Sequence, residues 1–186
     1  MNSGTRYKDL KDIPIGPGYP IKEKLQWARV IFQQVGMQMK EDRVIAGLLA
    51  DYDRKIDASW QAMWKNGVVE ECTICAVQDG GSCCGQGIEN KFDVVNLLVN
   101  LLFGVSLPDQ PWDHTGCWFL GPKGCLLKAR HVICVNFMCK RLYAAVPAER
   151  LQRVQMAMQA ETDAAFMLEE YIKSWLIRYE KSKSEK

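Results

Sequence analysis

Eight cysteines dominate the chemistry that this sequence offers. All of them lie between Cys72 and Cys139, and the rest of the 186-residue chain contains none. Their order is Cys72-x2-Cys75-x7-Cys83-Cys84 and, after an apolar stretch, Cys117-x7-Cys125-x8-Cys134-x4-Cys139. A Cys-x2-Cys pair lets two thiolates converge on one ion from a tight turn, as in many zinc and iron–sulfur sites. The sequence therefore predicts a cysteine-ligated metal centre within residues 72–139.

The number of sites and the grouping of their ligands stay open at this point. Zinc and iron–sulfur clusters typically take four protein ligands, so eight thiols suit two sites, or one site with further structural cysteines. Adjacent side chains tend to diverge, so we expect Cys83 and Cys84 to serve different sites, or one of them to lie outside the ligand set. In sequence order the cysteines form an N-terminal four (72, 75, 83, 84) and a C-terminal four (117, 125, 134, 139). A site that draws on both fours fits the spacing equally well.

Basic residues accompany the second four cysteines. They are Lys123, Lys128, Arg130, Lys140 and Arg141. Positive neighbours lower the pKa of a thiol and offset the negative charge of a multi-thiolate site. We expect Arg130 to donate hydrogen bonds to thiolates, with a plain surface arginine as the alternative. His131, three residues before Cys134, is a candidate metal ligand or hydrogen-bond partner of a thiolate. A single histidine in such a basic segment is more often an ordinary, partly exposed side chain.

The ordered cysteine motifs resemble the YkgJ-type CxxCxxCC family, whose members are described as zinc- or iron-chelating. The resemblance covers residues 72–139. It rests on Cys72-x2-Cys75, the Cys83-Cys84 doublet, Cys117-Trp118-Phe119-Leu120, Gly124-Cys125, Arg130-x3-Cys134 and Phe137-Met138-Cys139. The gap before the doublet is longer than is usual there, and His131 stands where proline usually follows the arginine. Some larger relatives with this cluster, the flagellin lysine methylases, imply that a 4Fe-4S cluster is one form of the centre.

Three functions are compatible with these motifs. The first is a metal-binding protein that holds an iron–sulfur cluster, or zinc, in an electron-transfer, redox-sensing or accessory role. The second is a thiol-redox or metal-delivery protein, and the third is an interaction protein whose long final helix, with Tyr171, Trp175 and Tyr179, docks a protein partner. No nucleophile–base pair is recognisable, so no reaction is predicted. Glu161, Glu169 and Glu170 lack the Glu-x-x-His motif of di-iron bundles.

The remaining composition points to a cytoplasmic protein. The first residues, MNSGTRYKDLKD, contain no apolar segment typical of a secretory signal. The most apolar run, Val94–Val105, is too short to span a bilayer. Without export, thiols stay reduced, which favours metal ligation over disulfides. A net charge of +2 gives no sign of a nucleic-acid partner.

Apolar periodicity predicts the elements that must position the cysteines. Residues 1–19 read as an extended arm, and a helix is expected from Pro20 with an apolar face from Ile21 to Met39. A second helix begins near Asp42 and stops at Gly67. Residues 70–90 read as a loop shaped by ligation, and residues 91–105 as a buried central helix.

A long helix should open at Val146-Pro147, before a polar tail at residues 181–186. The expected fold class is mainly α: a bundle of about four principal helices in a single domain over residues 20–180, with a cysteine-rich insertion.

Overall fold

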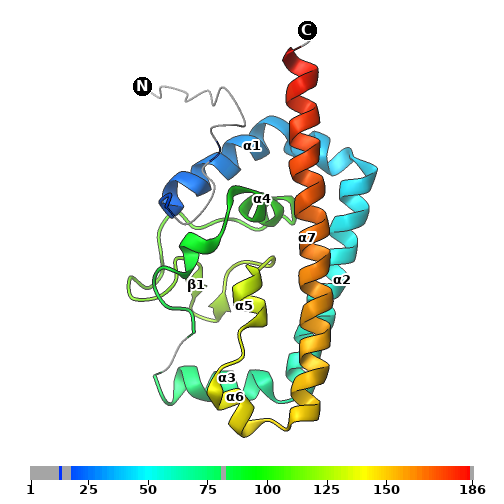
Figure 1. Ribbon diagram of the computed structural model, residues 1–186. Coiled ribbons are helices and arrows are strands. Elements are labelled where there is room, and N and C mark those ends of the chain that lie inside the picture. The colour runs from blue at the N-terminus through cyan, green and yellow to red at the C-terminus, as the bar shows by residue number, and fades with distance from the viewer. Residues whose placement is uncertain (1–12, 14–17, 81–82, 185–186) are drawn as a thin grey trace.

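A computed structural model describes residue 13 and residues 18–80 and 83–184 of the chain (Figure 1). The predicted N-terminal arm therefore lies mostly outside the described residues. The elements that the structure contains run α1 to α7, with a short 3-10 helix (Ile88–Lys91) between α3 and α4 and a two-stranded sheet between α4 and α5.

The first two helices form where the sequence predicts them. Helix α1 (Ile21–Glu41) ends at Asp42, whose side chain accepts hydrogen bonds from the backbone N–H groups of Val44 and Ile45 and so caps α2 (Arg43–Lys65). Such a cap satisfies N–H groups that have no partner within the helix. Gly67 follows α2 with φ = 82°, a left-handed conformation that favours glycine.

Helix α4 (Val94–Leu102) lies at the centre of the molecule. Asp93 caps it through a hydrogen bond from the Asn96 backbone N–H, and all its residues except Leu101 are buried. It packs against α1 on one side and α7 on another. A helix that is apolar on most sides needs such neighbours, so the predicted buried central helix is confirmed.

Helix α7 (Ala148–Ser184) runs along the whole molecule beside α2 (Figure 1). It begins directly after Pro147, as predicted. It also continues through most of residues 181–186, so the predicted polar tail is largely helical. Of its aromatic residues, Trp175 packs within the molecule: its indole N–H donates to Asp42 and its ring stacks on Tyr179 at a centroid distance of 5.3 Å.

The cysteine-rich segment is more helical than predicted. The expected loop at residues 70–90 begins with helix α3 (Val68–Val77), which carries both cysteines of the Cys-x2-Cys pair. Strands β1 (Leu120–Gly121) and β2 (Gly124–Cys125) then form a tight hairpin, followed by the short helices α5 (Val132–Asn136) and α6 (Lys140–Ala145). The two glutamates in the first turn of α3, Glu70 and Glu71, are favourable at a helix N-terminus.

Two hydrophobic cores hold these elements together. The larger core joins α1, α2, α4 and the C-terminal half of α7 with the residues around Phe92 and Phe119. The smaller core joins the end of α2 with α3, α5, α6 and the first turns of α7. The predicted mainly α fold class is therefore confirmed, with a small two-stranded sheet in the cysteine-rich segment. No helix in the described part of the chain is long and apolar enough to cross a membrane.

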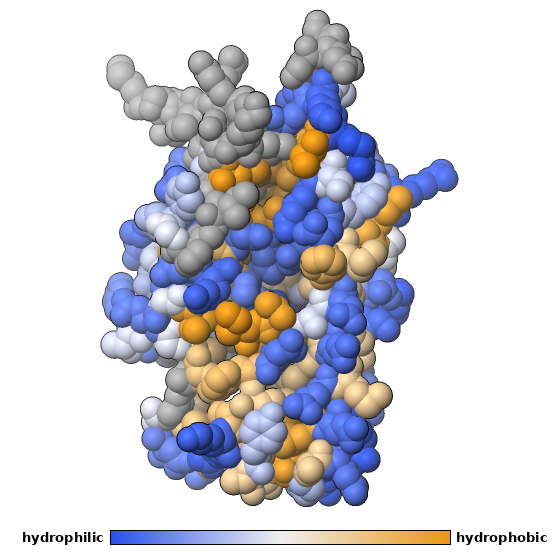
Figure 2. Space-filling model, viewed as in Figure 1, coloured by the Kyte–Doolittle hydropathy of each residue, from blue (hydrophilic) through white to orange (hydrophobic). Residues whose placement is uncertain are grey.

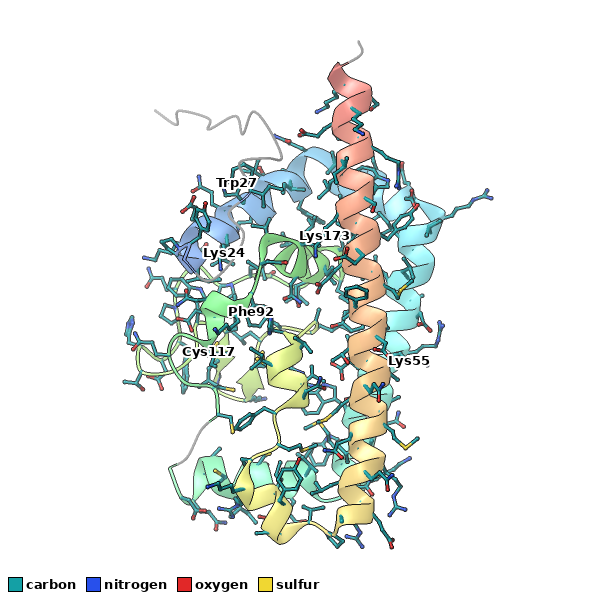
Figure 3. All side chains as sticks on the ribbon, in the orientation of Figure 1. Lys24, Trp27, Lys55, Phe92, Cys117 and Lys173 are labelled. Atoms are coloured by element: carbon teal, nitrogen blue, oxygen red, sulfur yellow. The ribbon has the colours of Figure 1, made fainter. Side chains whose placement is uncertain are left out.

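Buried polar contacts fix the cysteine-rich segment to the first core. The ammonium group of Lys24 on α1 is fully buried and donates to the carbonyl oxygens of Asn90 and Phe92, at 2.8 and 3.0 Å (Figure 3). Asn100 of α4 bonds to the backbone of residues 128 and 129. Hydrogen bonds of this kind satisfy backbone groups that would otherwise be buried without partners.

Glu169 of α7 gives the fold a dependence on pH. Burial raises the pKa of this carboxyl group above its ordinary value of 4.5, while a hydrogen bond from the Asn96 side-chain amide at 3.1 Å opposes the rise. A carboxyl group with a raised pKa in the folded state stabilises the fold below its unfolded pKa, and this contribution is lost as the pH rises through the folded pKa.

We therefore expect the Glu169→Gln variant to gain stability relative to the wild type as the pH rises. Glutamine stays neutral and can still accept the hydrogen bond from Asn96. Urea unfolding at pH values below 4.5 and at neutral pH measures the difference. Glu170→Gln is the control, because Glu170 is exposed beside it and pairs with Lys173. A difference between the wild type and Glu169→Gln that does not change with pH would contradict the expectation.

Candidate metal centre

Four cysteines gather where α3 meets α6. Cys72 and Cys75, three residues apart on α3, lie on one helix face, and Cys139 is the residue that caps α6. Arg141 of α6 ties the two helices together: its Nε atom is 3.1 Å from Glu71 of α3, and a second nitrogen pairs with Asp79. This ion pair brings Cys139 to the helix that carries the Cys-x2-Cys pair.

Electrostatic coupling adds Cys83 to this group. Burial raises the pKa of the Cys72 thiol, and the negative charges of Cys83, Cys139 and Cys75 raise it further, whereas Arg141 lowers it. Burial also raises the pKa of Cys83, with contributions from Cys139, Cys84 and Cys75. Charges act in this way only over short distances. We call Cys72, Cys75, Cys83 and Cys139 the first quartet.

The other four cysteines gather around the small hairpin. The backbone N–H of Cys117 donates to the carbonyl oxygen of Cys84 at 2.8 Å, and Gly85 and Gly116 form an antiparallel bridge beside them. The hairpin register pairs Cys125 with Leu120, whose N–H in turn donates to the Cys117 carbonyl. These backbone contacts bring Cys84, Cys117 and Cys125 together from three separate positions in the sequence.

We group Cys134 of α5 with them, because Cys125 and Cys84 act on its pKa. Burial raises the pKa of Cys134 to about 11, and Cys125 and Cys84 contribute to the rise. Burial raises the pKa of Cys117 to about 12, with contributions from Glu89, Cys125 and Cys84. We call Cys84, Cys117, Cys125 and Cys134 the second quartet.

The doublet is where the two quartets meet. Cys139, Cys84 and Cys75 all raise the pKa of Cys83, whereas Cys84 also acts on Cys117, Cys125 and Cys134. We therefore group Cys83 with the first quartet and Cys84 with the second, which differs from the groups in sequence order. Each quartet takes cysteines from both sides of α4. The eight cysteines, all within the described residues, form no disulfide with one another. Among the described residues, however, no three His, Cys, Asp or Glu side chains already lie close enough to hold one metal ion.

Arg130 and Arg141 each lie beside one quartet. Arg130 lowers the pKa of Cys125 and Cys134 against the larger effect of burial, as Arg141 does for Cys72. Its side chain is only 8% exposed and its guanidinium lies 4.4 Å from the centre of the Trp60 ring. The sequence singled out Arg130. The pairing of Arg141 with Glu71 and Asp79 has no local signal in the sequence.

His131 has a structural role at the start of α5. Its Nδ1 atom accepts a hydrogen bond from the backbone N–H of Ile133 at 3.2 Å, which caps the helix. Its ring packs against Phe92 at a centroid distance of 5.5 Å, and burial lowers its pKa. One of the two ring nitrogens, Nδ1, is therefore occupied in the helix cap and does not serve as a ligand or as a partner of a thiol.

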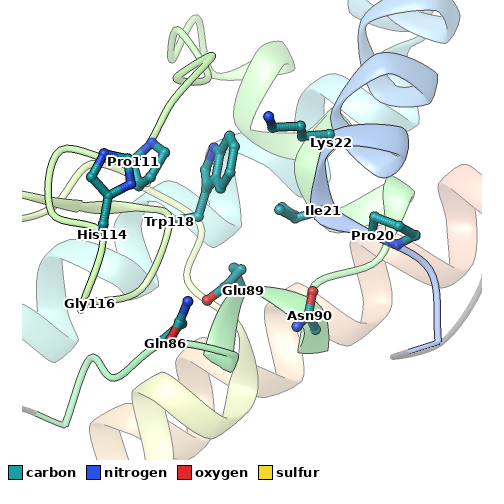
Figure 4. Close-up of a pocket in the computed structure, with 10 residues that line it drawn as sticks. All are labelled: Pro20, Ile21, Lys22, Gln86, Glu89, Asn90, Pro111, His114, Gly116 and Trp118. Atoms are coloured by element: carbon teal, nitrogen blue, oxygen red, sulfur yellow. The ribbon is translucent and has the colours of Figure 1, made fainter.

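A pocket of about 460 Å³ is lined in part by the two residues next to Cys117 in the sequence (Figure 4). Gly116 and Trp118, on either side of Cys117, line it together with Gln86, Glu89 and His114. The ammonium group of Lys22 lies 5.6 Å from the centre of the Trp118 ring. The pocket is open to solvent, so small molecules can approach the protein surface on this side of the second quartet.

Comparisons with protein-family models, curated proteins and solved structures found no match to this chain. The cysteine pattern must therefore be interpreted from its own geometry.

Proposed function

We propose that this protein binds metal through two four-cysteine sites, the first quartet holding one and the second quartet the other. The observation that carries the proposal is the division of the eight thiols into two groups of four, the ligand number of both zinc and iron–sulfur sites. Because no three His, Cys, Asp or Glu side chains lie close enough to hold one metal ion in the described part of the chain, the proposal requires the thiols to move inward as the metal binds. Metal sites commonly form together with their ligand loops in this way.

Iron–sulfur clusters of the 4Fe-4S type are the form we favour, with zinc as the alternative. Consecutive Cα atoms lie only about 3.8 Å apart, so clusters held by Cys83 and Cys84 would be close neighbours. Bound clusters would supply one-electron chemistry, which suits electron transfer, redox sensing or an accessory role. Two zinc ions would instead fix the cysteine-rich segment in place.

The protein's own residues would tune such a centre through charge and burial. Arg141 and Arg130 place one positive charge beside each quartet, which offsets part of the negative charge of bound thiolates. Cys117 is only 5% exposed, so the second quartet is partly shielded from water. Shielding of this kind and nearby charges are among the features that set the potential of a cluster.

Metal analysis of protein purified without oxygen tests the proposal. We expect broad absorbance near 400 nm and about eight iron and eight sulfide ions per chain, the content of two 4Fe-4S clusters. Colourless protein with about two zinc ions per chain would support the two sites and replace the iron–sulfur form with the zinc form.

Protein with neither metal would contradict the proposal. If it also contains disulfides on non-reducing mass spectrometry, the thiol-redox function would take its place. The control is the same preparation after treatment with a chelator and reductant, which should lose both the metal and any absorbance near 400 nm.

A further inference from the structure

A separate cavity lies between α2, α4, α5 and α7, and it shares Arg130 with the surroundings of the second quartet. It is a cavity of about 180 Å³, smaller than the pockets of about 300–1,000 Å³ that take drug-sized ligands. Tyr52, Asn96, Arg130 and Glu161 line it, and each of these side chains is more than nine-tenths buried. Two exposed apolar side chains, those of Phe166 and Val132, also line it.

The cavity contains acceptors without partners. Glu161 forms a long ion pair with Arg130, and Ser59 and Arg130 both lower the pKa of its carboxyl group against the larger effect of burial. Within the described part of the chain, its two oxygens, Asn96 Oδ1 and the Tyr52 hydroxyl have no partner at hydrogen-bonding distance. The Asn96 amide is oriented by its bond to Glu169, which leaves Oδ1 on the other side. A buried carboxylate that faces only a distant guanidinium group is incompletely compensated for its loss of water. Four acceptor atoms on three residues around one space suit a ligand with an ammonium group.

The cavity also contains donors without partners. Among the described residues, Arg130 Nε and Nη2 have no acceptor, although these two atoms form the side of the guanidinium that binds carboxylates in bidentate fashion. Glu161 Oε1 is 3.7 Å from Nη2, too far for a hydrogen bond. One face of the guanidinium is covered by Trp60. The free edge therefore suits a ligand carboxylate.

We propose that this cavity binds a small zwitterion, a molecule of the free amino-acid class, with its carboxylate on Arg130 and its ammonium group on Glu161 and Asn96. The cavity wall beyond these groups is apolar, with Val135 and Ala165 beside Phe166, and leaves room for a small side chain. His131 also lines the cavity, but its Nδ1 is already used in the α5 cap. Glu169 adds a second negative charge near the ammonium end. The proposal does not depend on the metal centre.

Calorimetry and thermal unfolding of the full chain, with each standard amino acid as the probe, test this inference. At a concentration about 100-fold above its Kd, a bound amino acid should raise Tm by about 5–10 °C. Propionate and propylamine are the matched probes, since each carries only one of the two charged groups. Both should bind far more weakly than the zwitterion.

Two variants assign the contacts. Glu161→Gln removes the charge but keeps the shape, and should weaken amino-acid binding by about 10- to 100-fold. Tyr52→Phe removes one hydroxyl group and should weaken amino-acid binding by about 2- to 10-fold. This variant tests the contact even if Glu161→Gln folds poorly. The control is Glu170→Gln, which removes one charge from the exposed side of α7 and should bind amino acids as the wild type does.

Three results would overturn the inference. The first is no binding of any amino acid, which would mean that water alone fills the cavity. The second is unchanged affinity in both Glu161→Gln and Tyr52→Phe. The third is binding of propionate or propylamine as tight as that of the zwitterion, because one of the two charged contacts would then contribute nothing.

Discussion

The double variant Cys83→Ser/Cys139→Ser should keep half of its metal, whereas Cys83→Ser/Cys84→Ser should lose all of it. In the first variant both changes fall in the first quartet, so the second site stays intact. In the second variant each site loses one ligand. For 4Fe-4S clusters the expected iron contents are about four atoms and about zero atoms per chain, compared with about eight in the wild type.

This pair of variants distinguishes the spatial grouping from the sequence-order grouping. If the ligand groups followed the sequence, Cys83→Ser/Cys84→Ser would keep one site and Cys83→Ser/Cys139→Ser would keep none, so the two results would be exchanged. Metal analysis after anaerobic purification measures both. Ala76→Ser is the control, because it adds a hydroxyl group to an exposed position of α3 next to Cys75 and should retain the wild-type metal content.

The Asn100→Ala variant should be destabilised by about 3–5 kcal/mol, a large share of the stability of an ordinary domain. Asn100 is fully buried. Its side-chain oxygen accepts from the backbone N–H groups of Lys128 and Ala129, both at 3.0 Å, and its nitrogen donates to the carbonyl oxygens of Asn96 and Ala129. Alanine would leave two buried N–H groups without partners and open a small cavity.

Loss of the Asn100 hydrogen bonds should also disturb the second quartet, because residues 128 and 129 lie between Cys125 and Cys134. We expect Asn100→Ala to lower Tm by about 6–20 °C and to reduce the metal bound by the second quartet more than that bound by the first. Urea unfolding and metal analysis measure the two effects. Asn136→Ala, at an exposed position of α5, should change stability by no more than about 0.5 kcal/mol. A loss below about 1 kcal/mol in Asn100→Ala would show that water replaces the side chain.

Local sequence signals predicted the helices that have clear ends. Asp42 could be recognised as the start of α2, because its short carboxylate suits a cap, and Gly67 as its stop, because glycine tolerates the left-handed conformation. Helix α4 was predictable from its continuous apolar composition. In contrast, Tyr52, Ile56, Trp60 and Trp64 recur at the spacing of one helix face, yet Trp64 is 67% exposed. Periodicity identifies a helix more reliably than the outer limits of its buried face.

The cysteine-rich segment was harder to predict, since its structure depends on distant contacts. The sequence analysis predicted a loop where helix α3 forms, because the glycine-rich residues after α3 obscure where the helix ends. Gly67 and the two glutamates of its first turn do indicate where it starts. The grouping of thiols depends on Arg141 meeting Glu71, which is 70 residues earlier in the chain. The cavity depends in the same way on Arg130 approaching Glu161. Spacing along a sequence contains no information on such pairs.

The route of α7 through both cores has a consequence for how the protein is made. Leu151, Val154 and Met158 complete the smaller core, and Leu168, Ile172 and Leu176 complete the larger one. On the ribosome, where folding proceeds as the chain emerges, all eight thiols are therefore synthesised before either core can close. During that interval the nascent cysteines are open to oxidation and to wrong partners. We infer that a cell producing this chain benefits from supplying metal and reducing conditions at the time when residues 151–176 dock.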